Sequence, residues 1–145
     1  MRGCFELSKY LAWVVFVTMV FDSTSSNANQ IAQGFVQVKI TATSSPQTIT
    51  SANCGISLFA FDSQTSIAYT ESVAKDVTPV NDVVTCIVTA PYFWNISNLN
   101  GNISISYSIS GQNGNGAIVK SASGGFAPIP LTTTGTTVLT VSTVF

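Results

Sequence analysis

Residues 102–111 read NISISYSISG, a strict alternation of apolar and polar side chains. The apolar positions are Ile103, Ile105, Tyr107 and Ile109, and each position between them is a serine. Because successive side chains of a β-strand point to opposite faces, this pattern predicts a strand with one buried and one solvated face. A helix would distribute the isoleucines around its axis, so helical spacing does not fit this segment.

Six further segments are predicted to be strands, because they alternate or are rich in β-branched and aromatic residues: residues 35–43, 54–61, 65–73, 82–90, 116–121 and 136–145. Glycine-, proline- and asparagine-rich stretches separate them, and GQNGNG at residues 111–116 has the composition of a hairpin turn. Sustained helical spacing is missing after the first thirty or so residues. The sequence therefore predicts an all-β fold, an antiparallel immunoglobulin-like β-sandwich.

An apolar run, LAWVVFVTMVF, occupies residues 11–21 and follows Arg2 and Lys9. It is shorter than the ~18–20 residues that a membrane-spanning helix needs. Small and polar residues follow it, so we expect a signal peptide over residues 1–28, with cleavage after Ala28, and a single secreted domain over residues 29–145. An uncleaved anchor or a buried apolar helix is the alternative. Contact with a membrane is expected only through this leader, before cleavage.

The domain after the leader contains two cysteines, Cys54 and Cys86. In an oxidising compartment an even pair in a small domain is most simply a disulfide. Closing a loop of that length contributes roughly 3–4 kcal/mol in the chain-entropy model. The alternative is a pair of buried free thiols.

The composition excludes most catalytic chemistry. The chain has no histidine and is only 8% charged, so the commonest general base and metal ligand is missing. Asp76 and Asp82 do not have the spacing of an EF-hand loop. Few basic residues are present to neutralise phosphates, which disfavours nucleic-acid binding. We expect a non-enzymatic protein with no cofactor and no metal.

Two N-x-Ser motifs occur, Asn95-Ile96-Ser97 and Asn102-Ile103-Ser104. Both lie at the edges of predicted strands, so Asn95 and Asn102 are candidate glycosylation sites in a secreted chain. In a host that attaches no N-linked glycans they are ordinary polar residues of loops.

Four features occur together: a leader, an N-terminal strand segment, two strands that carry cysteines, and an alternating end that closes with Phe145. In this pattern the chain resembles the immunoglobulin-like, strand-donating pilin and thread subunits of bacteria and archaea. The resemblance implies a secreted structural protein of the cell surface or of a filament (a pilus), which associates with itself or with another surface protein. It also implies that residues 31–40 insert into the next subunit, with these side chains on the donated strand: Ile31, Phe35, Val36, Val38 and Ile40. The alternative is that this segment is the first strand of a complete domain.

A second hypothesis rests on Tyr92, Phe93 and Trp94, which follow Pro91 as a compact aromatic cluster. Aromatic side chains on a loop can stack on sugars or fill a partner's pocket. This hypothesis predicts a monomeric secreted recognition module for a carbohydrate or a protein. The alternative is that the cluster caps one end of the core.

Overall fold

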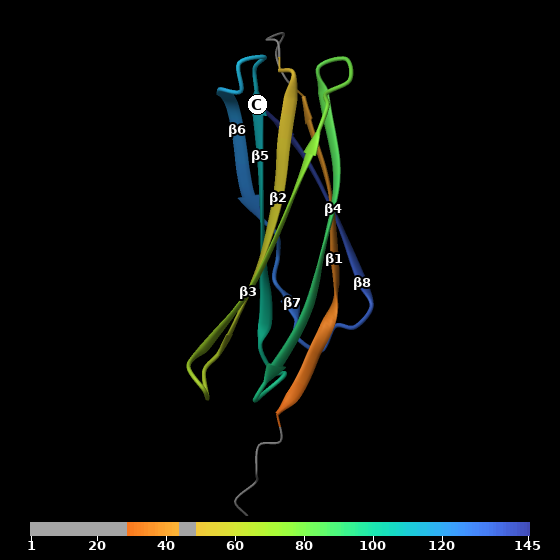
Figure 1. Ribbon diagram of the computed structural model, residues 1–145. Helices are drawn as coiled ribbons and strands as arrows, with labels where there is room; N and C mark the ends of the chain where they lie inside the picture. Colours follow the sequence, from red (N-terminus) through yellow and green to blue (C-terminus); the bar gives the residue numbers. More distant parts are fainter. Residues whose placement is uncertain (1–28, 44–48) are drawn as a thin grey trace, which may run out of the picture.

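The computed structural model describes residues 29–43 and 49–145, which form two β-sheets packed face to face (Figure 1). The described residues contain no α-helix. The predicted all-β sandwich is therefore confirmed. The expected signal peptide, residues 1–28, lies outside the described residues.

The first sheet has three strands in the order β4-β1-β8. Its members are β1 (Gln30–Thr43), β4 (Val83–Ile96) and β8 (Thr136–Val144). The strand β1 runs antiparallel to β4 but parallel to β8. This parallel pair departs from the antiparallel pattern that we expected. A parallel pair requires a long connection between its strands, and β1 and β8 are far apart in sequence.

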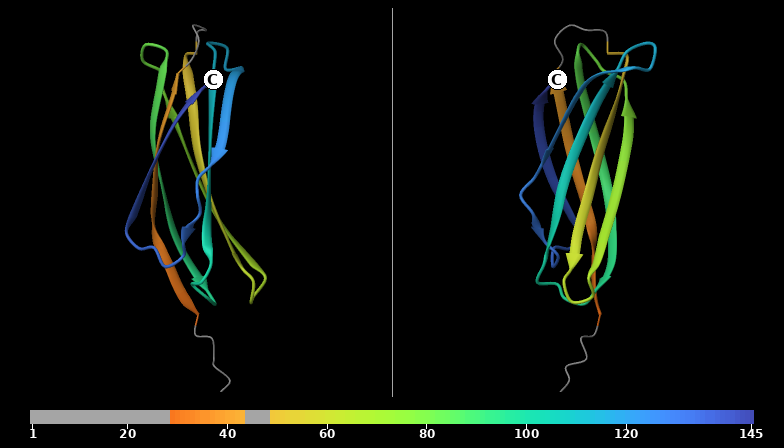
Figure 2. Two further views of the ribbon diagram at one scale, coloured as in Figure 1. Left: turned by 180° about the vertical axis from the view of Figure 1, so that it is seen from behind. Right: turned by 90° about the vertical axis from the view of Figure 1, so that its left-hand side faces the viewer.

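The second sheet has five strands, with the path β3-β2-β5-β6 and a short strand, β7, paired to β5. Its members are β2 (Ser51–Asp62), β3 (Ile67–Val77), β5 (Asn102–Gln112), β6 (Ile118–Gly125) and β7 (Ile129–Pro130). All of its pairings are antiparallel. The two views of Figure 2 show this sheet lying against the first over most of the length of the molecule.

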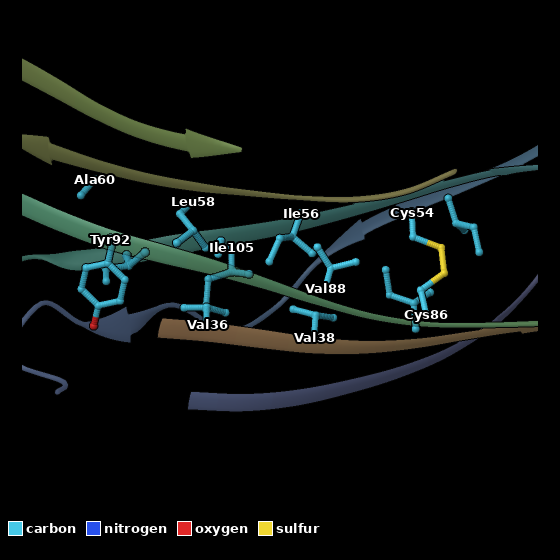
Figure 3. Close-up of a cluster of buried hydrophobic side chains, with 14 of the residues drawn as sticks. Val36, Val38, Cys54, Ile56, Leu58, Ala60, Cys86, Val88, Tyr92 and Ile105 are labelled. Carbon is cyan, nitrogen blue, oxygen red and sulfur yellow. A yellow bond between two sulfur atoms is a disulfide. The ribbon is translucent and has the colours of Figure 1, made fainter. Parts of the chain in front are cut away.

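The core lies between the sheets and follows the alternation in the sequence. In β5 the residues Ile103, Ile105 and Ile109 are buried, and the serines between them are exposed or half-buried. The strands β1, β2 and β4 alternate in the same way, and Figure 3 shows their inward side chains meeting. Leu139, Val141 and Phe145 at the end of the chain pack against the same core.

A tight turn joins β5 to β6 where GQNGNG predicts a hairpin. The backbone amide of Gly116 donates a 2.9 Å hydrogen bond to the carbonyl of Asn113, and Gly116 has a φ of 77°. Glycine adopts this left-handed conformation without a steric penalty. The predicted hairpin is therefore present.

Candidate functional site

The strand β1 occupies the middle of the three-stranded sheet, and it is the feature on which a candidate function can be built. It pairs with β4 from Gln30, opposite Ile96, to Thr43, opposite Val83. On its other side it pairs with β8 over residues 35–43. Among the described residues β4 and β8 are not paired with each other, so β1 is what joins them into one sheet.

The five residues predicted for a donated strand all lie in β1, but they divide between its two faces. Val36, Val38 and Ile40 point inward and are completely buried. Ile31 and Phe35 are about half exposed and point outward. These two side chains therefore do not fill the core, because the odd-numbered positions of this strand face away from the second sheet.

Gly34 of β1 lies where a side chain would not fit. A Cβ atom at this position would lie 2.6 Å from the hydroxyl oxygen of Tyr92 and 2.9 Å from the carbonyl oxygen of Gly135. The Tyr92 hydroxyl donates a 2.7 Å hydrogen bond to the carbonyl of Thr133, and burial raises the pKa of this phenol. The sequence shows a glycine inside a strand pattern, which signals such a close approach but does not identify the neighbour.

The aromatic residues 92–94 lie within β4 and not in a loop. Tyr92 and Trp94 point into the core, where their ring centroids are 5.3 Å apart, and Tyr69 lies 5.9 Å from Trp94 on the other side. Trp94 is only 6% exposed, whereas Phe93 is 67% exposed. The interpretation of this cluster as one end of the core therefore applies to Tyr92 and Trp94, and only Phe93 is free to contact a partner.

An open, mainly apolar groove of about 420 Å³ lies where β1, β4 and the segment before β8 meet. Phe35 and Phe93 flank it, and Gln33, Pro91 and Gly135 contribute to its walls. Three of its eight lining residues belong to β1, so the groove is complete only when β1 is in place. No pattern in the sequence predicts this groove, because its walls are distant in the sequence.

Cys54 on β2 and Cys86 on β4 form a disulfide between the two sheets, with their Cα atoms 6.5 Å apart (Figure 3). The predicted pairing is thus present. Both residues are buried, and Ile40 of β1 lies opposite Cys86 in the ladder. The bridge holds β4 against the second sheet independently of β1.

Asp62 is a buried carboxylate at the end of β2, and the sequence analysis did not single it out. The Ser97 hydroxyl donates a 2.6 Å hydrogen bond to Oδ1, and the Ser97 amide donates a 2.9 Å bond to Oδ2. The Gln64 amide also donates to Oδ1, at 3.0 Å. These hydrogen bonds hold the pKa of Asp62 well below its ordinary value, against the opposing effect of burial. The carboxylate therefore fastens the end of β4 to the β2–β3 turn.

The two candidate glycosylation sites lie in different surroundings. Asn95 is exposed on the outer face of β4, but Ser97 of its motif is buried against Asp62. Asn102 is the first residue of β5, and both it and Ser104 are exposed. Neither asparagine belongs to the groove.

The described residues contain no group of three or more acidic or cysteine side chains that could hold a metal ion. Asp76 instead accepts a 2.7 Å hydrogen bond from the side-chain amide of Asn53. Over the same part of the chain, we find no helix with the length and apolar character needed to cross a membrane.

Comparison of the chain with protein-family models, with curated proteins and with solved structures returned no match in any of the three. We therefore infer the function from the fold and from the place of β1 within it.

Proposed function

We propose that this chain is a secreted, non-enzymatic structural subunit of a cell surface or filament, and that its copies join by donating β1 to one another. The observation that supports this proposal is the position of β1 between β4 and β8. An N-terminal strand that fills the middle of a sheet can be supplied by the same chain or by another copy, since the contacts are identical in both cases.

Removal of β1 would leave a gap between β4 and β8, and this gap would be a strong acceptor for a donated strand. Val36, Val38 and Ile40 of β1 are completely buried. Complete burial of each such side chain contributes about 1.5–3 kcal/mol, and the backbone of β1 is hydrogen-bonded on both sides. If this gap were empty, the apolar surface that these side chains contact and the unpaired edges of β4 and β8 would face water. A donated strand is therefore held tightly.

The connection from β1 to β2 determines where a donating copy would lie. Thr43 and Ser51 are at the same end of the sandwich (Figure 1). The chain from Thr43 to Ser51 can span at most roughly 29 Å when fully extended. A donor must therefore lie against that end of its acceptor. Sequential donation then produces a filament, whereas reciprocal donation produces a closed dimer.

The low charge of the chain favours contact between copies. Only 8% of its residues are charged and its formal net charge is −1, so electrostatic repulsion between identical subunits is weak. Serine and threonine residues occupy most outward positions of β5 and β8, and they add no charge to those faces.

Cross-linking tests the proposal directly. Gln37 and Thr89 are opposite each other on β1 and β4, and the Gln37 side-chain amide donates a 3.2 Å hydrogen bond to the Thr89 hydroxyl. Proteins carrying only Gln37→Cys and only Thr89→Cys are mixed, taken through partial unfolding and refolding, and treated with a short thiol-reactive cross-linker. Donation predicts a product that contains one chain of each variant. Pairing Gln37→Cys with Ser72→Cys, on the distant strand β3, is the control.

The protein with both substitutions, Gln37→Cys and Thr89→Cys, then reports the form of the assembly. A covalent ladder on a denaturing gel indicates sequential donation, and dimers alone indicate reciprocal donation and would rule out the filament. Cross-links that stay within single chains, under conditions where the protein self-associates, would refute strand donation.

A second candidate function is supported by the groove beside Phe93. This ring is 67% exposed on an apolar surface, a place where a sugar or a partner side chain can stack. Phe93→Ala should abolish retention on a cell-surface polysaccharide or partner protein without changing the melting curve. Unaltered retention would dismiss this role for the groove.

A further inference from the structure

We propose that Asn95 is an N-glycosylation site that is modified before the chain folds, and that its sugar then covers the exposed ring of Phe93. The inference does not depend on strand donation, and it is an alternative to ligand binding beside Phe93, because a ring covered by the chain's own sugar is not free to stack on a partner. Asn95 is exposed and lies on the same outer face of β4 as Phe93, two residues earlier. Residues two apart on a strand lie about 7 Å from each other, which is within reach of the first sugar on an asparagine.

The reaction requires both the asparagine amide and the serine hydroxyl of the motif. The amide nitrogen attacks the anomeric carbon of a lipid-linked saccharide phosphate, which a host transferase binds. A nitrogen–carbon bond forms, the carbon–oxygen bond to the phosphate breaks, and the lipid phosphate leaves with the bonding electron pair. The amide nitrogen loses one proton, which a basic group of the transferase accepts.

In the folded chain this motif is not accessible to a transferase. The Ser97 hydroxyl is committed to Asp62 by a 2.6 Å hydrogen bond, and the residue is only 9% exposed. The backbone carbonyl of Asn95 accepts a hydrogen bond from the Tyr69 hydroxyl. Asn95 also lies in the ladder opposite Ile31 of β1. Transfer to Asn95 must therefore precede the docking of β4 against β1 and the β2–β3 turn.

The surface around Asn95 is suited to a sugar. Phe93 is 67% exposed and Ile31, directly opposite Asn95, is 54% exposed. The apolar C–H face of a sugar ring that packs on Phe93 removes part of this surface from water. The second motif has no such neighbour before it, because the residue two positions before Asn102 is the polar Asn100.

The first test compares acceptor states. Folded protein with its disulfide intact, and the same chain reduced, alkylated and unfolded, are each given a purified oligosaccharyltransferase with its lipid-linked donor. The occupancy of Asn95 and Asn102 is measured by peptide mass spectrometry. We expect modification of Asn95 to fall at least tenfold on folding, and that of Asn102, whose Ser104 is exposed, to fall much less. Equal modification of Asn95 in both states, or none at Asn95 in an unfolded chain that is modified at Asn102, would overturn the proposal.

The second test measures the contact with Phe93. All proteins carry Asn102→Gln, so that one motif remains, and are secreted from a glycosylating host. Phe93→Ser should lower Tm by about 3–6 °C more in the protein glycosylated at Asn95 than in its Asn95→Gln counterpart. Ile87→Ser changes another exposed residue of β4 far from Asn95 and should cost the same in both backgrounds. Equal losses for Phe93→Ser in the two backgrounds would refute the contact.

Discussion

Replacing Ile40 by alanine tests whether β1 is part of the folded core. Ile40 is completely buried in the middle of the three-stranded sheet, opposite Cys86 of β4 and Val141 of β8. Truncation of such a side chain removes its favourable transfer free energy and leaves a cavity. The Cys54–Cys86 disulfide limits how far β4 can move to fill this cavity. The expected loss in the free energy of unfolding is therefore in the upper part of about 2–5 kcal/mol.

Urea unfolding of the oxidised protein, followed by tryptophan fluorescence, measures this loss. With a typical slope of about 1–3 kcal/mol per molar urea, a loss of about 4 kcal/mol should lower the midpoint by roughly 1–4 M. Lys39→Ala is the matched control, because Lys39 is the neighbouring residue of β1 and points outward. Its effect should stay within about 0.5 kcal/mol.

A graded variant makes the test sharper. Ile40→Val removes one methylene group and should cost about 0.5–1.5 kcal/mol, between the control and the alanine variant. If Ile40→Ala unfolds at the same urea concentration as Lys39→Ala, β1 is not docked in the protein in solution. That result would refute both the place of β1 in the sheet and the argument for its donation.

Four further outcomes are expected. Cys54→Ser together with Cys86→Ser should lower the free energy of unfolding by about 3–4 kcal/mol, and a reduced wild-type protein that melts like the oxidised one would contradict this. Because the pKa of Asp62 is lowered in the folded chain, the unfolded chain binds more protons in acid than the folded chain does. The free energy of unfolding should therefore fall as the pH drops below about 4. Asp62→Asn should flatten that part of the profile of unfolding free energy against pH. Gly34→Ala should destabilise by about 1–3 kcal/mol in thermal unfolding, since its Cβ would meet the Tyr92 ring; an unchanged Tm would show that β1 can shift. Trp94 should fluoresce at short wavelength in the folded chain, because it is buried between Tyr69 and Tyr92, and an emission maximum typical of exposed tryptophan would contradict its place in the core.

The sequence predicts the strands that form much of the candidate site. Which side chains of β1 and β4 point inward and which point outward requires the alternation of each strand to be followed residue by residue. The segment 35–43 predicts a strand with Val36, Val38 and Ile40 on one side, and the structure confirms it. Ile31 and Phe35 occupy positions of opposite parity, so alternation alone places them on the other face. The same parity rule, applied to residues 92–94, would have separated Phe93 from its two neighbours.

Other features had no signal in the sequence. Asp62 and Ser97 are 35 residues apart and meet only because β2 and β4 end near each other. The groove beside Phe93 draws its walls from three separate segments. Contacts of this kind depend on which strands become neighbours, and alternation along one segment carries no information about its partners.

The sequence by itself indicated most of the strands, their inward faces and the two cysteines that pair, Cys54 and Cys86, because side-chain alternation and cysteine content are local properties of the chain. Only the tertiary structure decided that β1 lies between β4 and β8, and that it runs parallel to β8. The order of strands is chosen by how all the apolar faces can be buried at once. The strand order therefore depends on the whole sandwich and not on any one segment. The position of β1 between β4 and β8 is what makes it a candidate for donation.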